Sequence, residues 1–172
     1  METMISLDSK SMKRARKILD HPVYQKYAKK IAHHEKSRKF CGHDMTHFLN
    51  VARIAMLLNL EENEEPIRKD WVYGAALLHD IGRFVQYEDG TDHALASAKL
   101  APEILRDCGY SEEETEIISE AIANHRNKEI KDGSDLKGIL YRADKASRPC
   151  YGCQMQSACN WKKKKKNMKL EI

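Results

Sequence analysis

Four histidines and two aspartates fall on the apolar faces of segments with helical periodicity. They are His47, His79, Asp80, His93, His125 and Asp144. Taken singly, a histidine on an apolar face is more often a hydrogen-bonded core residue than a ligand. Together, buried imidazoles and carboxylates would be costly unless a cation satisfied them. The pattern therefore predicts a site for one or two divalent transition-metal ions, and these ligands suit Fe, Mn, Zn, Co or Ni without selecting among them.

These residues also occur in an informative order. The local motifs are GHDMTHFLNV around His47, LLHDIGR around His79 and Asp80, and YRADK around Asp144. In this H…HD…D order they resemble the HD superfamily of metal-dependent phosphohydrolases, over roughly residues 20–148. The resemblance implies a helical core with the metal site in its interior.

The same resemblance implies roles for individual residues. A first metal ion would have four ligands, His47, His79, Asp80 and Asp144. In HD proteins with two ions, the aspartate of the HD pair bridges them and two further histidines complete the second site. The matching residues here are His93 and His125. These two histidines could instead contact a substrate phosphate.

The expected chemistry is hydrolysis by a water molecule that the metal activates. No serine, threonine or cysteine stands next to an evident base, so a covalent intermediate is not indicated. Asp80 would ligate the metal and could also steer the attacking water. Arg83 follows on a predicted loop, where its guanidinium could bind a phosphate oxygen or simply be exposed.

Other charged residues near the expected ligands have two interpretations. Arg126, Lys128 and Lys145 would either add positive potential for an anionic substrate or be ordinary surface charges. Asp44 is a good N-cap candidate, although with His43 it could also support the metal site. The remaining histidines have no evident place in that site: His21, His33, His34 and His43.

Three of the five cysteines form a C-x2-C-x5-C cluster, at Cys150, Cys153 and Cys159. In a cytosolic chain this spacing is more typical of metal or redox chemistry than of disulfides. Three thiolates are one short of a closed tetrahedral zinc site, and Cys41 is the candidate for the fourth ligand. The same thiolates would suit an iron–sulfur cluster. The alternative is a reduced and loosely ordered tail.

The elements that must position these residues are predicted to be helices throughout. Apolar residues recur with the helical period, and no strand-like alternation extends beyond a few residues. The predicted helices span about 9–19, 22–38, 44–59, 67–80, 93–108, a stretch that starts after Ser111, and 135–147. We therefore expect an all-α fold, a single HD-type bundle of about six or seven helices.

Several positions mark where these helices begin, end or bend. Gly82 ends one helix, and a loop rich in turn residues is expected to run from there to Asp92. Pro102 must kink its helix or begin a new one. Ser111 and Glu114 fit a capping box at the start of the next helix.

Length and composition favour one domain. The chain has 172 residues, 41% of them apolar and 33% charged, which is too apolar for a disordered chain and too polar for a membrane protein. We expect a helical domain at residues 1–148 and a Cys- and Lys-rich appendix at residues 149–172, which is not an independent domain. No apolar run approaches the ~20 residues that span a bilayer, and the first residues lack a secretory signal. A cytoplasmic location is therefore expected.

The net charge of +4 is concentrated in one place. The run Lys162–Lys166 contributes five positive charges, so the rest of the chain sums to −1. A nucleic-acid-binding domain would instead show basic residues over one face of the fold. The lysine run is therefore interpreted as a solvated tail, and nucleic-acid binding is not favoured.

The leading hypothesis is a metal-dependent phosphohydrolase that acts on a phosphomonoester or a small nucleotide. An alternative is a catalytically silent HD fold that binds a nucleotide or a partner. A third is a polyanion- or RNA-binding protein whose binding elements are the Cys cluster and the lysine run. The complete ligand set favours the first, because a binding module does not need every hydrolytic ligand. The Gly-Tyr-Pro tripeptide of the cyclic-di-GMP-degrading branch does not occur.

Overall fold

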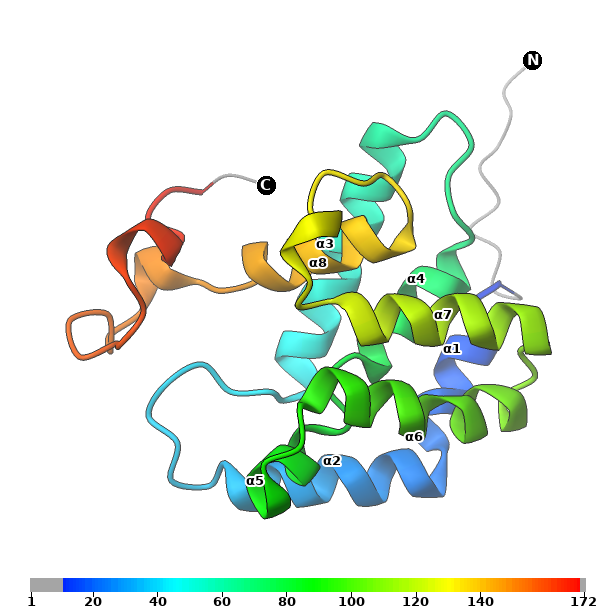
Figure 1. The fold of residues 1–172 in the computed structure, drawn as a ribbon, viewed down its shortest axis with the longest axis horizontal. Coiled ribbons are helices and arrows are strands. Elements are labelled where there is room, and N and C mark those ends of the chain that lie inside the picture. The colour runs from blue at the N-terminus through cyan, green and yellow to red at the C-terminus, as the bar shows by residue number, and fades with distance from the viewer. Residues whose placement is uncertain (1–10, 171–172) are drawn as a thin grey trace.

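The computed structural model describes residues 11–170, and all regular structure in that range is helical (Figure 1). The α-helices are α1 (Ser11–Asp20), α2 (Pro22–His34), α3 (Met45–Glu62), α4 (Lys69–Leu78), α5 (Arg83–Asp89), α6 (His93–Asp107), α7 (Glu112–Asn124) and α8 (Leu136–Ala146). Short 3-10 turns are η1 (Lys128–Ile130), η2 (Cys150–Gly152) and η3 (Lys163–Lys165). The predicted all-α class is confirmed. The parts of the predicted elements that fall on residues 1–10 and 171–172 lie outside the described residues.

Helix α4 lies at the centre of the bundle. Its buried residues occupy nearly every side of the helix, which is typical of a helix surrounded by others. It contacts α1, α3, α6, α7 and α8. Gly74 permits one close approach, since a Cβ there would lie 3.1 Å from the hydroxyl of Tyr110. Because α4 is held from all sides, the buried residues that follow it, His79 and Asp80, lie in the interior.

Side-chain caps fix where five of the α-helices begin, and three of these caps lie at α3, α6 and α7. The Asp44 carboxylate accepts a hydrogen bond from the His47 amide at 3.0 Å, so the predicted N-cap of α3 is confirmed. Asp92 caps α6 in the same way. At α7, Ser111 and Glu114 form the predicted capping box. Each cap satisfies amides that the first helical turn leaves unpaired.

The stretch after Gly82 was expected to be a loop, and this expectation is wrong, because α5 lies there. Phe84 explains the difference, since its side chain is buried and stacks on Tyr27 with ring centroids 4.9 Å apart. Gly82 is needed for a close approach, because a Cβ on it would collide with the backbone of Ser97. The Gly82 amide donates to the Ser97 hydroxyl at 2.8 Å, so α6 packs directly on this corner.

Pro102 does not begin a new helix. Helix α6 continues through it from His93 to Asp107. A proline inside a helix removes one backbone hydrogen bond, and packing has to compensate for the loss. The side chains of Ala101 and Ile104 are fully buried beside it, so the apolar face of α6 maintains the helix across this position.

The appendix extends from the end of α8 on one side of the bundle (Figure 1). Its attachment to α8 depends on Asn167, whose side-chain amide donates to the carbonyls of Lys145, Ala146 and Arg148 at 2.8, 3.2 and 2.9 Å. Because the last carbonyls of a helix have no partner within it, the appendix satisfies groups that α8 leaves unpaired. None of the described helices has the length and apolarity that crossing a membrane requires.

A network of ion pairs joins α1, α4 and α7. Arg14 donates to Glu114 Oε2 at 2.5 Å and to Asp70 Oδ2 at 2.8 Å. Glu114 also accepts hydrogen bonds from the Trp71 indole at 3.0 Å and the Ser111 amide at 2.8 Å. These bonds, above all those from Arg14, lower the pKa of Glu114 to about 2. The ionised form of Glu114 therefore stabilises the fold.

Replacing Glu114 by glutamine should lower the free energy of unfolding at pH 7 by about 1–3 kcal/mol, because charged donors lose their partner. The folded-state pKa lies below the ordinary value of 4.5, so this contribution is complete above pH 4.5 and is lost as the pH falls toward 2. The destabilisation should therefore be smaller at pH 3 than at pH 7, as measured by urea unfolding.

The matched control is Glu113→Gln, one residue earlier on the exposed side of α7. It should change the free energy of unfolding by less than about 0.5 kcal/mol. Equal destabilisation by Glu114→Gln at both pH values would contradict the role assigned to its ionised carboxylate.

Candidate metal centre

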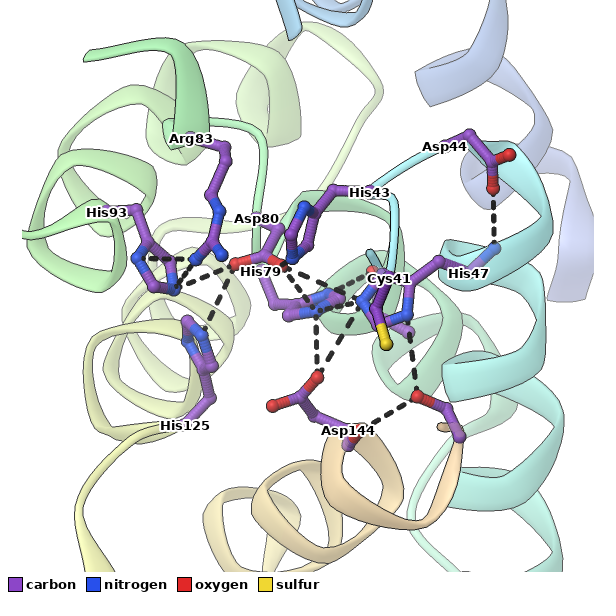
Figure 2. A network of polar contacts seen from close by, with 12 residues as sticks. Cys41, His43, Asp44, His47, His79, Asp80, Arg83, His93, His125 and Asp144 are labelled. Carbon is purple, nitrogen blue, oxygen red and sulfur yellow. Dashed lines mark hydrogen bonds and ion pairs between the residues drawn. The ribbon is translucent and has the colours of Figure 1, made fainter. Parts of the chain in front are cut away.

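The structure brings all six predicted side chains together inside the bundle (Figure 2). They come from five segments: His47 lies in α3, His79 and Asp80 directly follow α4, His93 begins α6, His125 directly follows α7, and Asp144 lies in α8. Four of them are buried, and His47 and Asp144 are partly exposed at a cleft. Residues from well-separated parts of the sequence thus share one interior region.

One oxygen of Asp80 faces a first group of ligating atoms. The Nε2 atoms of His47 and His79 lie 3.7 and 3.5 Å from Asp80 Oδ2 and 3.3 Å from each other. Asp144 Oδ1 lies 3.7 and 3.8 Å from the same two nitrogens, while the ammonium of Lys145 contacts its other oxygen. The ligating atoms of His47, His79 and Asp80 all lie within 4.8 Å of one another, a spacing able to hold a metal ion.

The other oxygen of Asp80 faces a second group. Asp80 Oδ1 lies 3.1 Å from His93 Nε2 and 3.5 Å from His125 Nε2, and these ligating atoms also lie within 4.8 Å of one another. Although this oxygen is buried, no donor is aligned to form a hydrogen bond with it. A buried carboxylate oxygen without a hydrogen bond is costly, and a cation between it and the imidazoles would satisfy it.

Hydrogen bonds hold three of the imidazoles in a ligating orientation. The Nδ1 atoms of His79 and His125 lie 2.7 Å from the carbonyls of Ala76 and Ile122, three residues earlier on their helices. Nδ1 of His93 lies 2.8 Å from Gln86 Oε1. A carbonyl oxygen only accepts, so Nδ1 of His79 and of His125 carries a proton, and Nε2, which faces Asp80, is the nitrogen placed to ligate a metal. Metal-bound histidines are usually supported in this way.

The protonation states also fit a metal. Burial lowers the pKa of His79 to about 3, so its imidazole is neutral at pH 7. Burial opposes ionisation of Asp80, but the surrounding imidazoles, His79 first, hold its pKa well below the ordinary value. Neutral imidazoles and ionised carboxylates are the forms that bind metals. The donor set, its orientation and the unsatisfied Asp80 oxygen together fit a divalent transition metal.

His43 lies beside the site, as in the alternative that the sequence left open in which His43 and Asp44 support the metal centre. Its Nε2 lies 3.7 Å from Asp80 Oδ2, and its Nδ1 lies 2.5 Å from Glu35 Oε1. Glu35 stands just after α2, which ends at His34, about four residues before its predicted end. The Glu35 carboxylate also accepts from the Tyr87 hydroxyl at 2.6 Å. In the sequence, His43 precedes the expected ligand His47 by four residues, and this spacing is the feature that could have indicated that His43 lies near the site.

Arg83 lies beside the second group rather than on an exposed loop. It is the first residue of α5 and is partly buried. Its Nη1 lies 2.9 Å from both ring nitrogens of His93, and its Nε donates to the Tyr87 hydroxyl at 3.4 Å. Arg83 and Asp80 line the same cleft, so the guanidinium can reach an anionic group bound there.

The centre opens into a cleft of about 650 Å³. Basic side chains line it: Arg38, Arg83, Arg126, Lys128, Lys145, Arg148, Lys164, Lys165 and Lys166. Three of them already have acidic partners, Arg38 with Glu35, Arg126 with Asp92 and Lys145 with Asp144. The lysine run is largely exposed, as expected of a solvated segment, but three of its members line this cleft. Positive charge thus surrounds the carboxylates of the centre.

Comparison with known proteins identifies two relatives and a structural neighbour. Over 153 residues, 89% of this chain and 95% of the relative, it is 46% identical to an uncharacterized protein of Clostridium beijerinckii. Over 107 residues it is 33% identical to ribonuclease Y of Rubrobacter xylanophilus, a match that covers 61% of this chain but 18% of that protein. The crystal structure of a predicted HD superfamily hydrolase from an uncultured Thermotogales bacterium has the same fold, with a TM-score of 0.59 and 24% identity over 84% of this chain and 81% of that one.

The family match covers the helices that carry the centre. Residues 44–148 match the HD domain model. This range is more than half of the chain and includes all six predicted ligands. The resemblance noted in the motifs around the histidines and aspartates is therefore confirmed, and the chain belongs to the HD domain family.

Proposed function

We propose that this chain is a metal-dependent phosphohydrolase that hydrolyses a phosphomonoester or a small nucleotide. The observation that carries the proposal is the position of Asp80, whose two oxygens face two separate groups of imidazoles at the base of a basic cleft. A carboxylate in this position can bridge two cations, an arrangement that suits phosphoryl transfer.

The first metal ion would be held by His47, His79, Asp80 and Asp144, and the second by Asp80, His93 and His125. Bound divalent ions supply Lewis-acid polarisation of a phosphoryl oxygen and lower the pKa of a water molecule. The protein itself orients the ligands through the carbonyls of Ala76 and Ile122. The side chain of Arg83 can bind a phosphate oxygen from the side of His93.

The cleft indicates the size and charge of the substrate. Its volume of about 650 Å³ is within the range of small-molecule sites. Its basic lining favours an anionic substrate. Lys128 and Arg148 line the cleft without being metal-ligand candidates, and they add to this positive charge. These features support a phosphorylated small molecule rather than a large polymer.

Two alternatives remain from other functional classes. A catalytically silent HD fold would bind the metal and a nucleotide without hydrolysing it. An RNA-binding protein is the third candidate, and the similarity to a ribonuclease Y over part of the chain is the observation that favours it. The experiments below separate these alternatives.

The first experiment tests the centre with a His79→Ala/Asp80→Ala double variant. The His/Asp centre should contribute roughly one or two equivalents to the transition-metal content of wild-type protein in elemental analysis. The double variant should lose the metal that this centre holds, and hydrolysis of nucleotides and phosphomonoesters should fall by about 100-fold or more. The matched control is His33→Ala/Asp132→Ala, which removes the same two residue types from exposed positions and should preserve both properties.

The possible outcomes distinguish the proposals. Full metal content in the double variant would refute the ligand assignment. Metal-loaded wild type that hydrolyses neither monoesters, nucleotides nor diesters would refute the phosphohydrolase and favour the binding module.

The second experiment tests the basic cleft with Lys164→Gln/Lys165→Gln. The variant should raise KM for an anionic substrate by about tenfold at low ionic strength and leave kcat unchanged, because the lysines attract the substrate without contacting the reacting atoms. Added salt should reduce the difference. The control Lys26→Gln/Lys29→Gln removes equal charge from exposed positions on α2 and should leave KM unchanged.

A KM that does not respond to the two cleft lysines would contradict their role in substrate capture. Tight RNA binding with a steep salt dependence, abolished by the same variant, would instead support the RNA-binding alternative.

A further inference from the structure

Four cysteines from distant parts of the sequence line one cavity of about 260 Å³. Cys41 lies between α2 and α3, whereas Cys150, Cys153 and Cys159 lie in the appendix. The fifth cysteine, Cys108, is buried in the apolar core. All four cysteines outside the apolar core therefore line the same cavity.

The backbone around the C-x2-C pair forms a tight turn. The Cys153 amide donates to the Cys150 carbonyl at 3.3 Å, and the Gln156 amide donates to the Cys153 carbonyl at 3.2 Å. The Gln156 side chain also donates to the Cys150 carbonyl, at 2.9 Å. The turn keeps the two thiols at the same cavity, as the C-x2-C elements of zinc sites do.

The appendix has no apolar core of its own. None of residues 144–170 is buried, and the large apolar side chains of Tyr151, Trp161 and Met168 are exposed. Segments of this size that lack a core are usually held by disulfides or by a metal. A metal bound by Cys41 and the appendix cysteines would supply this constraint and would join the appendix to the segment that leads into α3.

Basic side chains surround the thiols. Arg38 and Lys166 line the cavity, and Arg38 Nε donates to the Cys41 carbonyl at 2.7 Å. The Arg148 guanidinium lies 4.4 Å from the ring centroid of Trp161, which forms another wall. Four thiolates around a divalent ion leave about two net negative charges, and these cations offset them.

We propose that Cys41, Cys150, Cys153 and Cys159 together bind one structural zinc ion. Zinc takes four thiolates in a tetrahedron at about 2.3 Å, and such a site has no open position for a substrate. In the described chain, the groups whose ligating atoms already lie within 4.8 Å of one another are those of the His/Asp centre. The four cysteine sulfurs are not among these groups, so they must move closer together when zinc binds.

The zinc site would position the lysine run. The cavity and the cleft of the His/Asp centre share four lining residues, Arg38, Cys41, Trp161 and Lys166. Cys41 lines that cleft together with His43 and His47, all three of which are labelled in Figure 2. A zinc ion bound at the cysteines would therefore hold the appendix against the cleft without taking part in the chemistry there.

The test uses full-length protein and cobalt as a spectroscopic substitute for zinc. Cobalt-loaded wild type should show an intense near-ultraviolet charge-transfer band from thiolate ligands, which His and Asp ligands do not give. Elemental analysis should find about one equivalent less zinc in Cys150→Ser/Cys153→Ser and in Cys41→Ser than in wild type. The control Cys108→Ala removes a thiol from the core and should keep both the band and the zinc.

This inference is independent of the proposed function. The His79→Ala/Asp80→Ala variant should lose hydrolysis and retain the thiolate–cobalt band. If the cysteine variants do not fold, wild type alone still provides a test. Removing zinc with a chelator should speed tryptic cleavage within Lys162–Lys166 by about tenfold, and added zinc should reverse this.

Three results would overturn the zinc site. The first is cobalt-loaded wild type without a thiolate band. The second is unchanged zinc content in folded Cys150→Ser/Cys153→Ser protein. The third is iron and acid-labile sulfide in place of zinc, which would assign the four thiolates to an iron–sulfur cluster.

Discussion

The carboxylate of Asp80 is ionised and buried at the centre of the helical bundle, where one of its oxygens has no hydrogen-bond donor. A charge removed from water is strongly destabilising unless partners face it. Imidazole nitrogens face both oxygens, with His79 on the side of Oδ2 and His93 on the side of Oδ1, and a cation held between them would supply the missing partner. The Nε2 atoms of these imidazoles face the Asp80 carboxylate. This one arrangement of side chains therefore determines both how the buried charge is satisfied and how a metal can bind.

Helix ends provide that arrangement. His79 and His125 each stand at the C-cap of a helix, where a carbonyl three residues earlier accepts their Nδ1 protons. Both helices are fixed by the core, because α4 is enclosed by its neighbours and α7 packs on it. Gly82 then lets α6 approach closely enough for His93 to face the second oxygen of Asp80.

Two kinds of ligand set lie next to each other in this chain. The His/Asp centre combines hard and borderline ligands and opens into a basic cleft, which suits chemistry on an anion. The four-cysteine cavity is a soft ligand set on a segment without a core, which suits a structural ion. Because Arg38 and Trp161 line both spaces, the position of the appendix affects the charge around the cleft.

The helical class and the set of converging residues can be predicted from the chain alone, because a 3.6-residue period and the chemistry of His and Asp are local properties of the sequence. Features that depend on contacts between distant segments could not be predicted in this way. Phe84 stabilises α5 by stacking on Tyr27, so a stretch rich in turn residues became a helix. His43 reaches Asp80 only because Glu35 orients it, and lysines of the appendix line the cleft only because that segment folds back beside α8. No local pattern encodes these contacts, since each arises when helices pack.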